Sequence, residues 1–204
     1  MSEKIFQPFI APEKNVRELT VKSILLGSLF GVIFGAATVY LALKAGLTVS
    51  ASIPIAVIAI TLGRRFFKTT ILENNIIQTT GSAGESIAAG VAFTLPGFLF
   101  LSSPDSAQYF NYLTILILAI VGGLLGTLLM IPLRKALIVN EHGNLPYPEG
   151  TACGDVLKAG EKGGDFARTA FIGLGVAFSY ALLQKVLRVI AELPYYMTKQ
   201  VNKF

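Results

Sequence analysis

Long apolar stretches without a charged residue constrain the fold of this chain more than any other feature. Four of them approach or exceed the roughly 20 mostly apolar residues that a membrane helix needs: Ser23–Leu43, Ala45–Gly63, Ser106–Leu133 and Thr169–Gln184. Of the 204 residues, 53% are hydrophobic and only 14% are charged, whereas about a quarter are charged in a typical soluble domain. This composition excludes a disordered chain and favours the bilayer over water as its solvent.

A further segment, Asn74–Leu101, is mostly apolar but contains Glu85 and several small polar residues. We therefore predict an all-α fold: a polytopic transmembrane helix bundle of about five membrane segments, in a single membrane domain over residues 1–204. The predicted segments are residues 21–43, 45–63, 72–101, 107–133 and 168–193, and a cytoplasmic loop is predicted at residues 134–167.

The basic residues predict how these segments are oriented. If the N-terminus is cytoplasmic and every segment crosses the membrane, twelve Lys and Arg residues lie on the cytoplasmic side and three lie outside. Such an excess is typical of cytoplasmic loops, and it is lost if residues 74–101 turn back without crossing. We therefore predict a multi-pass cell-membrane protein with a cytoplasmic N-terminus and an external loop at Ser102–Gln108. Membrane orientation also explains the net charge of +5 better than nucleic-acid binding does.

A polar stripe marks the third segment. At about 100° per residue in a helix, Asn74, Gln78, Ser82 and Glu85 fall within one narrow sector of the surface, with Glu85 near the middle of the segment. A carboxylate at the bilayer centre costs about 3 kcal/mol on insertion scales. Such residues usually mark a transport pathway or a proton relay, and a structural ion pair is the main alternative. The stripe is therefore a candidate pathway for a substrate or a coupling ion.

Gly81 and Gly84 lie within the same stretch and predict an interruption of the third helix. Two glycines in four residues weaken a helix, and interrupted membrane helices offer backbone groups to ions and substrates. Close helix packing is the alternative. In the second segment Pro54 predicts a kink, and the hydroxyls of Thr48, Ser50 and Ser52 before it either line a cavity or simply pack.

Glycines recur at intervals of four residues in two other segments. The first segment contains Gly27, Gly31 and Gly35, and the fourth contains Gly122 and Gly126. Small residues at this spacing lie on one face and let a neighbouring helix approach closely. The pattern predicts tight packing within the bundle rather than a dedicated dimer interface.

The predicted loop at residues 134–167 contains His142 and Cys153, the only histidine and cysteine of the chain. Thr151 suits the N-cap of a short helix. The spacing of His142, Glu149 and Cys153 matches no zinc pattern, so no metal site is expected. The sequence contains no nucleotide-binding motif, and an intramembrane enzyme needs a nucleophile and a base inside the membrane. We therefore expect neither a cofactor nor enzyme activity.

Two stretches resemble signatures of the oligopeptide transporter family, in its prokaryotic branch, which is related to the yellow-stripe-like metal-chelate carriers of plants. The first is Glu73–Pro96, with the sequence ENNIIQTTGSAGESIAAGVAFTLP, and the second is Leu145–Glu161, with the sequence LPYPEGTACGDVLKAGE. The two stretches occur in the expected order and separation. The resemblance extends from about Phe9 to about Tyr196.

This resemblance implies a polytopic secondary carrier that takes up small peptides or metal-chelate conjugates together with protons. Family members are several times longer, so the chain corresponds to their N-terminal part, and the remaining helices would come from the same gene or from a companion chain. Glu85 would then be the coupling carboxylate, with Asn74, Gln78 and Ser82 as partners for the substrate. A non-transporting membrane subunit or an inactive gene fragment is the alternative.

Overall fold

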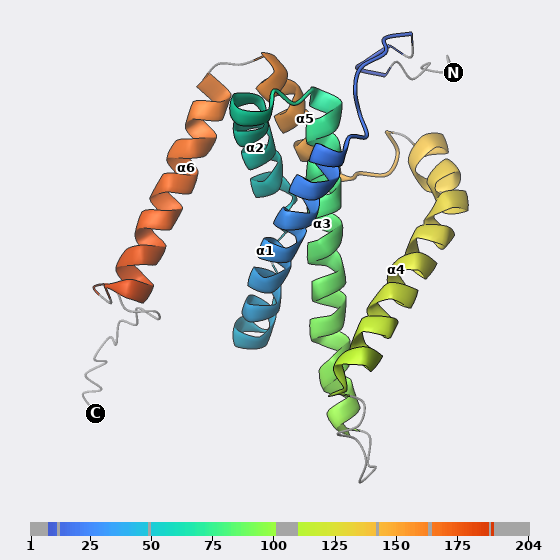
Figure 1. The fold of residues 1–204 in the computed structure, drawn as a ribbon, viewed down its shortest axis with the longest axis vertical. Helices are drawn as coiled ribbons and strands as arrows, with labels where there is room; N and C mark the ends of the chain where they lie inside the picture. Colours follow the sequence, from blue (N-terminus) through green and yellow to red (C-terminus); the bar gives the residue numbers. More distant parts are fainter. Residues whose placement is uncertain are drawn as a thin grey trace, which may run out of the picture. The chain divides into compact units, whose positions relative to one another are not determined.

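The computed structural model describes residues 8–11, 13–48, 50–100, 110–141, 143–162, 165–187 and 189. The regular elements of this part are helices (Figure 1): α1 Val21–Ala45, α2 Ser52–Leu62, α3 Ile71–Thr94, α4 Tyr112–Leu133, α5 Pro148–Lys162 and α6 Asp165–Ala181. The all-α prediction is thus confirmed for the described residues. The chain divides into two compact units, Met1–Glu161 and Lys162–Phe204. The predicted external loop Ser102–Gln108 and His142 lie outside the described residues.

Two stretches of the described chain are long and apolar enough to cross a membrane, judged by length and composition. They are Val21–Ala45 and Tyr112–Asn140, the latter being α4 with its π-helical continuation Arg134–Asn140. Helix α3 is also long enough to cross a membrane, but its polar stripe makes it less apolar than these two stretches. A membrane bundle agrees with these findings, and the number of five spans stays a prediction.

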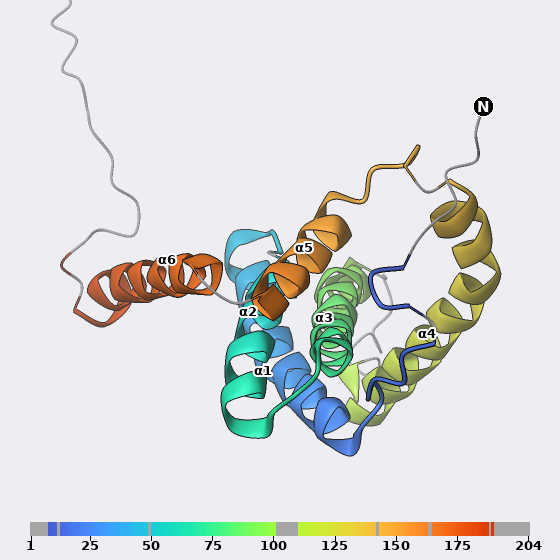
Figure 2. The ribbon, with the colours of Figure 1, turned by 90° about the horizontal axis from the view of Figure 1, so that it is seen from above.

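Helices α1 and α3 lie side by side and run in the same direction (Figures 1 and 2). At their N-terminal ends the Thr20 hydroxyl donates a hydrogen bond of 2.7 Å to Glu73 Oε1. Further along, glycines of α1 meet residues of α3 at the same sequence separation of 53 residues. The pairs are Gly27 with Thr80, Gly31 with Gly84, and Gly35 with Ala88. The packing role predicted for the glycines of the first segment is confirmed.

Both helices begin where the sequence places a capping residue. Thr20 and Thr70 are the N-caps of α1 and α3, and each forms a reciprocal capping box, with Ser23 and Glu73 respectively. A capping box satisfies two backbone N–H groups that a helix start otherwise leaves without partners. The Thr70 hydroxyl also donates to the carbonyl of Arg17, in the segment that leads into α1. These contacts therefore hold the N-terminal ends of α1 and α3 next to each other.

The interruption predicted for the third segment is wrong, because α3 is one continuous helix from Ile71 to Thr94. Its glycines serve as contact surfaces. A methyl group added at Gly84 would lie 2.7 Å from the Cα of Gly31, and one added at Gly81 would meet Ile55 at 3.0 Å. Each glycine lowers helix stability by about 1 kcal/mol relative to alanine. The close contacts with α1 and α2 offset that loss.

The interruption occurs in the second segment instead. Helix α1 ends at Gly46, whose left-handed backbone (φ 69°) caps it, and α2 begins only at Ser52. Pro54 therefore lies in the first turn of α2, where its missing N–H needs no partner, and the mid-span kink predicted at Pro54 is wrong. At its other end α2 leads into a π-helical turn, Gly63–Phe67. In the predicted span at residues 45–63, the described residues between α1 and Ser52 are thus non-helical, and a short helix follows them.

Helix α5 packs against this short α2. It begins at Pro148, three residues before the predicted N-cap Thr151, because a proline suits the first position of a helix. Its Val156 and Leu157 form an apolar cluster with Ala56 and Ile60 of α2. Figure 2 shows α5 beside both α2 and α3. Part of the predicted loop at residues 134–167 is therefore a helix that packs on the bundle.

Candidate functional site

The N-terminus of α2 meets the carboxylate of Glu85 on α3. The Glu85 side chain is only 7% exposed, and its Oε2 accepts a hydrogen bond of 3.2 Å from the backbone N–H of Ala51, which is the N-cap residue of α2. The first N–H groups of a helix lack partners within the helix and carry partial positive charge. Among the described residues Glu85 forms no ion pair with Lys or Arg, so the helix start takes the place of the structural ion pair considered above.

Hydroxyl groups surround this contact. The Ser52 and Ser82 side-chain oxygens lie 2.6 Å apart and join the first residue of α2 to α3. A cavity of about 370 Å³ opens beside them. Its lining consists mainly of hydroxyl and carboxylate side chains from α3, α5 and the segment around the start of α2: Thr48, Ser50, Ser52, Ser82, Glu85, Ser86, Ala89 and Glu149. The hydroxyls before Pro54 therefore line a cavity.

A second cavity of about 430 Å³ adjoins the first and shares four of its residues, Ser52, Ser82, Ser86 and Glu149. It continues along α3 past Asn75, Gln78 and Thr79 and along α5 past Gly150, Cys153 and Gly154. We call the two together the polar cavity. No Lys or Arg is among the described residues that line either part.

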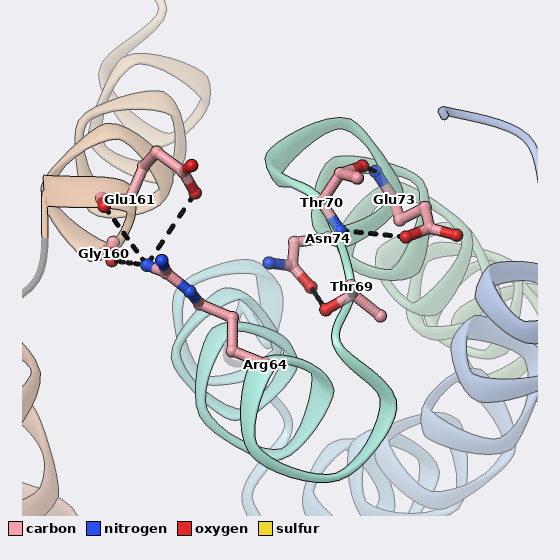
Figure 3. Close-up of polar contacts among 7 residues, drawn as sticks. All are labelled: Arg64, Thr69, Thr70, Glu73, Asn74, Gly160 and Glu161. Carbon is pink, nitrogen blue, oxygen red and sulfur yellow. Dashed lines mark hydrogen bonds and ion pairs between the residues drawn. The ribbon is translucent and has the colours of Figure 1, made fainter. Parts of the chain in front are cut away.

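Figure 3 shows polar contacts at the start of α3 and between Arg64 and the end of α5. The Arg64 guanidinium follows α2 and donates to the backbone carbonyls of Gly160 and Glu161 at the end of α5. It also lies 3.8 Å from the Glu161 carboxylate. Carbonyls at a helix C-terminus lack partners within the helix and carry partial negative charge. Arg64 therefore binds the end of α5 to α2.

The predicted pathway residues divide into two groups. Gln78, Ser82 and Glu85 line the polar cavity. Asn74 does not: it is buried, and its Oδ1 accepts a hydrogen bond of 2.6 Å from the Thr69 hydroxyl (Figure 3). Gly81 and Gly84 face α2 and α1 instead. The roles of these residues in transport stay predictions.

Glu149 is the cavity residue that the sequence reasoning missed. The sequence suggested it only as a possible metal ligand, and its place in the first turn of α5 brings it to both parts of the polar cavity. The signal was present in the second family-like stretch, where Glu149 follows two closely spaced prolines. Nothing local to that stretch shows that it packs against α3, which is some 60 residues earlier in the chain.

Cys153 lies on α5 between Glu149 and the apolar cluster. It is buried, and the Gln78 side-chain amide donates a weak contact of 3.8 Å to its sulfur. Burial raises the pKa of the Cys153 thiol, because the thiolate loses hydration, and the nearby Glu149 carboxylate raises this pKa further. The thiol is therefore a slow nucleophile at neutral pH and a useful reporter on the second part of the cavity.

An apolar groove of about 510 Å³ lies between α3 and α4, lined by residues such as Ile87, Val91, Leu118 and Ala119. It holds few polar groups and no charged side chain among its described residues. The charged side chains that line these spaces therefore belong to the polar cavity.

Membrane-length helices, a half-length helix that starts beside a buried carboxylate, and a polar cavity at that start together indicate a membrane transport protein. The sequence comparison identifies the family. The model of the OPT oligopeptide transporter protein family matches residues 18–202, and the chain belongs to this family. The family consists of transporters rather than enzymes. The resemblance of the two signature stretches is thereby confirmed.

One curated relative matches over a large part of the chain. The Haemophilus influenzae protein named "Putative oligopeptide transporter" is 40% identical over 155 residues, which are 75% of this chain and 24% of that protein. The chain therefore spans about a quarter of the length of this relative. No solved structure matches the chain.

Proposed function

We propose that this chain forms part of a secondary active membrane carrier for oligopeptides or related metal-chelate conjugates, coupled to protons. The observation that carries the proposal is the buried Glu85 carboxylate at the start of α2, beside the polar cavity. Carriers commonly place their sites at the ends of discontinuous helices near the membrane midplane. Family membership supports peptides as the substrate class.

Glu85 has the geometry of a group that can gain and lose a proton in place. Its Oε2 accepts the Ala51 N–H, while none of the described residues donates a hydrogen bond to Oε1. A proton on Oε1 thus leaves the bond to Ala51 intact. The polar cavity also presents the Gln78 amide and the Ser82 hydroxyl, which both donate and accept hydrogen bonds. These two side chains are suited to the backbone groups of a peptide.

Asn74, Gly81 and Gly84 have a different part in this proposal. Asn74 fixes the turn between α2 and α3 through Thr69, and the two glycines let α2 and α1 approach α3 closely. They position the cavity rather than contact the substrate. The parallel run of α1 and α3 supports the proposed topology, because it places both helix starts on one side of the membrane and requires the second segment to return across it.

The chain spans about a quarter of its curated relative, and this supports a need for further helices. Carriers of this kind have their site between two repeats, so we propose that the same gene or a companion chain supplies the second wall of the cavity. The coverage of only about a quarter of the relative also supports the second candidate, a non-transporting membrane subunit or an inactive fragment. Saturable peptide uptake that depends on this chain, measured with and without it in cells, separates the two.

The decisive substitution is Glu85→Gln, which keeps the size of the side chain and removes its ionisation. Uptake of labelled tripeptides is measured against external pH in membrane vesicles that contain the complete carrier. We expect normal membrane insertion and loss of the pH dependence of uptake, whereas the matched control Glu141→Gln, at the turn that follows Arg134–Asn140 and outside the lining of the polar cavity, behaves as the wild type. Full pH-dependent uptake by Glu85→Gln contradicts the coupling role. If this variant fails to insert into the membrane, the role of Glu85 is structural instead.

A further inference from the structure

The polar cavity contains a second carboxylate that coupling does not need. Glu149 lies in the first turn of α5 and lines both parts of the cavity. None of the described residues forms a hydrogen bond or an ion pair with its side chain. An acidic residue in the first turn stabilises a helix, because the helix start carries partial positive charge. That effect explains a carboxylate at the start of α5, but it does not require the start of α5 to lie at the cavity.

The described residues that line the polar cavity include two carboxylates and no Lys or Arg. Glu85 is more than nine-tenths buried and presents Oε1 without a hydrogen-bond donor among the described residues. Glu149 adds a second carboxylate from another helix, and the remaining polar lining is hydroxyl and amide groups. Two carboxylates that share a partly closed space repel each other, and a cation bound between them relieves this repulsion.

The geometry points to an organic ammonium as the ligand of this space, and we propose that the polar cavity binds the ammonium group of the transported substrate between Glu85 and Glu149. This inference rests on the proposed function. An ammonium has three N–H donors and no acceptor. The two carboxylates and the Ser52–Ser82 hydroxyl pair are acceptors from three different elements around one cavity.

Two further observations favour an organic cation over a bare metal ion. The described residues contain no group of three or more His, Cys, Asp or Glu side chains that could hold a metal. The two parts of the cavity, about 370 and 430 Å³, each fall within the roughly 300–1,000 Å³ of small-molecule sites. That space accommodates a small peptide whose ammonium lies near Glu149 and whose chain extends toward Gln78.

Cys153 allows binding to be measured separately from transport. It lines the part of the cavity next to Glu149, so a bound peptide shields its thiol. Membranes with the complete carrier are treated with a small maleimide, and alkylation of the Cys153-containing peptide is quantified by mass spectrometry. We expect trialanine to slow alkylation in a saturable way, and N-acetyl-trialanine to need an about ten- to hundredfold higher concentration, as expected for the loss of a charged hydrogen bond.

The Glu149→Gln variant tests the residue itself. We expect it to raise the half-protecting concentration of trialanine about ten- to hundredfold while that of N-acetyl-trialanine stays within about twofold. The control Asp155→Asn removes an exposed carboxylate of the same helix, outside the cavity lining, and is expected to match the wild type. An N-acetylated peptide with an internal lysine distinguishes the sources of the ammonium. If this peptide protects Cys153 from alkylation, the site binds a side-chain ammonium. If it does not, the site binds the ammonium of the peptide N-terminus.

The outcomes separate this inference from the proposed function. Equal protection by free and acetylated peptides in the wild-type carrier overturns the ammonium site and leaves peptide transport standing. Absence of both protection and uptake with every peptide overturns both. If Glu149→Gln fails to insert, the comparison of free and acetylated peptides in the wild type still decides the question, because it uses no variant.

Discussion

The contact between α1 and α3 yields a prediction whose size follows from the structure. Gly84 and Gly90 both lie on α3, and replacing either with alanine gains about 1 kcal/mol of helix propensity. A methyl group at Gly90 meets nothing within 4 Å of the described atoms. At Gly84 the same methyl lies 2.7 Å from the Cα and 3.0 Å from the carbonyl carbon and oxygen of Gly31. Backbone atoms cannot turn aside, so α1 and α3 must separate.

Such overpacking costs about 1–3 kcal/mol. Because the propensity gain is the same at both positions, the difference between Gly84→Ala and Gly90→Ala isolates the helix contact. For a chain of 150–250 residues about 1 kcal/mol corresponds to about 2–4 °C in Tm, so Gly84→Ala is expected to melt several degrees below Gly90→Ala. Heating in detergent with a fluorogenic maleimide follows the exposure of the buried Cys153. Equal melting temperatures, or a higher one for Gly84→Ala, contradict the α1–α3 packing.

Three further predictions follow from the topology, from Arg64 and from the thiol. Single cysteines at Ser103 and Gly163, in a Cys153→Ser background, are expected to react with impermeant maleimide from opposite sides of the membrane, and labelling from one side removes the five-span model. Arg64→Ala is expected to raise the alkylation rate of Cys153 a few-fold by releasing the end of α5, whereas Arg65→Ala leaves it unchanged; equal rates show that Arg64 does not hold α5. Because its pKa is raised, the Cys153 thiol is expected to react with maleimide more slowly than glutathione at pH 8. Its reaction rate is expected to keep rising at pH values where the rate of glutathione has levelled off, and parallel rate–pH curves refute this.

The sequence predicted well the features that depend on local chemistry. The glycine spacing of α1 specifies a packing face, and the polar stripe of α3 brought Gln78, Ser82 and Glu85 to one cavity. These predictions succeed because helical periodicity alone decides which side chains share a face.

The sequence failed where neighbours decide the outcome. Gly81 and Gly84 lower helix propensity, yet contacts with α2 and α1 keep α3 continuous. The apolar run from residue 45 to 63 reads as one helix, because hydropathy measures solvent preference and not backbone conformation, and so the late start of α2 was missed. Glu149 was missed because the other residues that line the cavity belong to elements far away in the sequence.

The glycine contacts between α1 and α3 also decide which parts of the molecule can move. Where two backbones touch directly, no side chains lie between them to change rotamer and absorb a displacement, so the pair is expected to move as one body. Helix α2 also packs closely on α3, where Ile55 meets Gly81, whereas α5 reaches α3 through the contact of Cys153 with Gln78. The paired helices are thus expected to form a fixed frame, in which Glu85 of α3 keeps its position relative to α1.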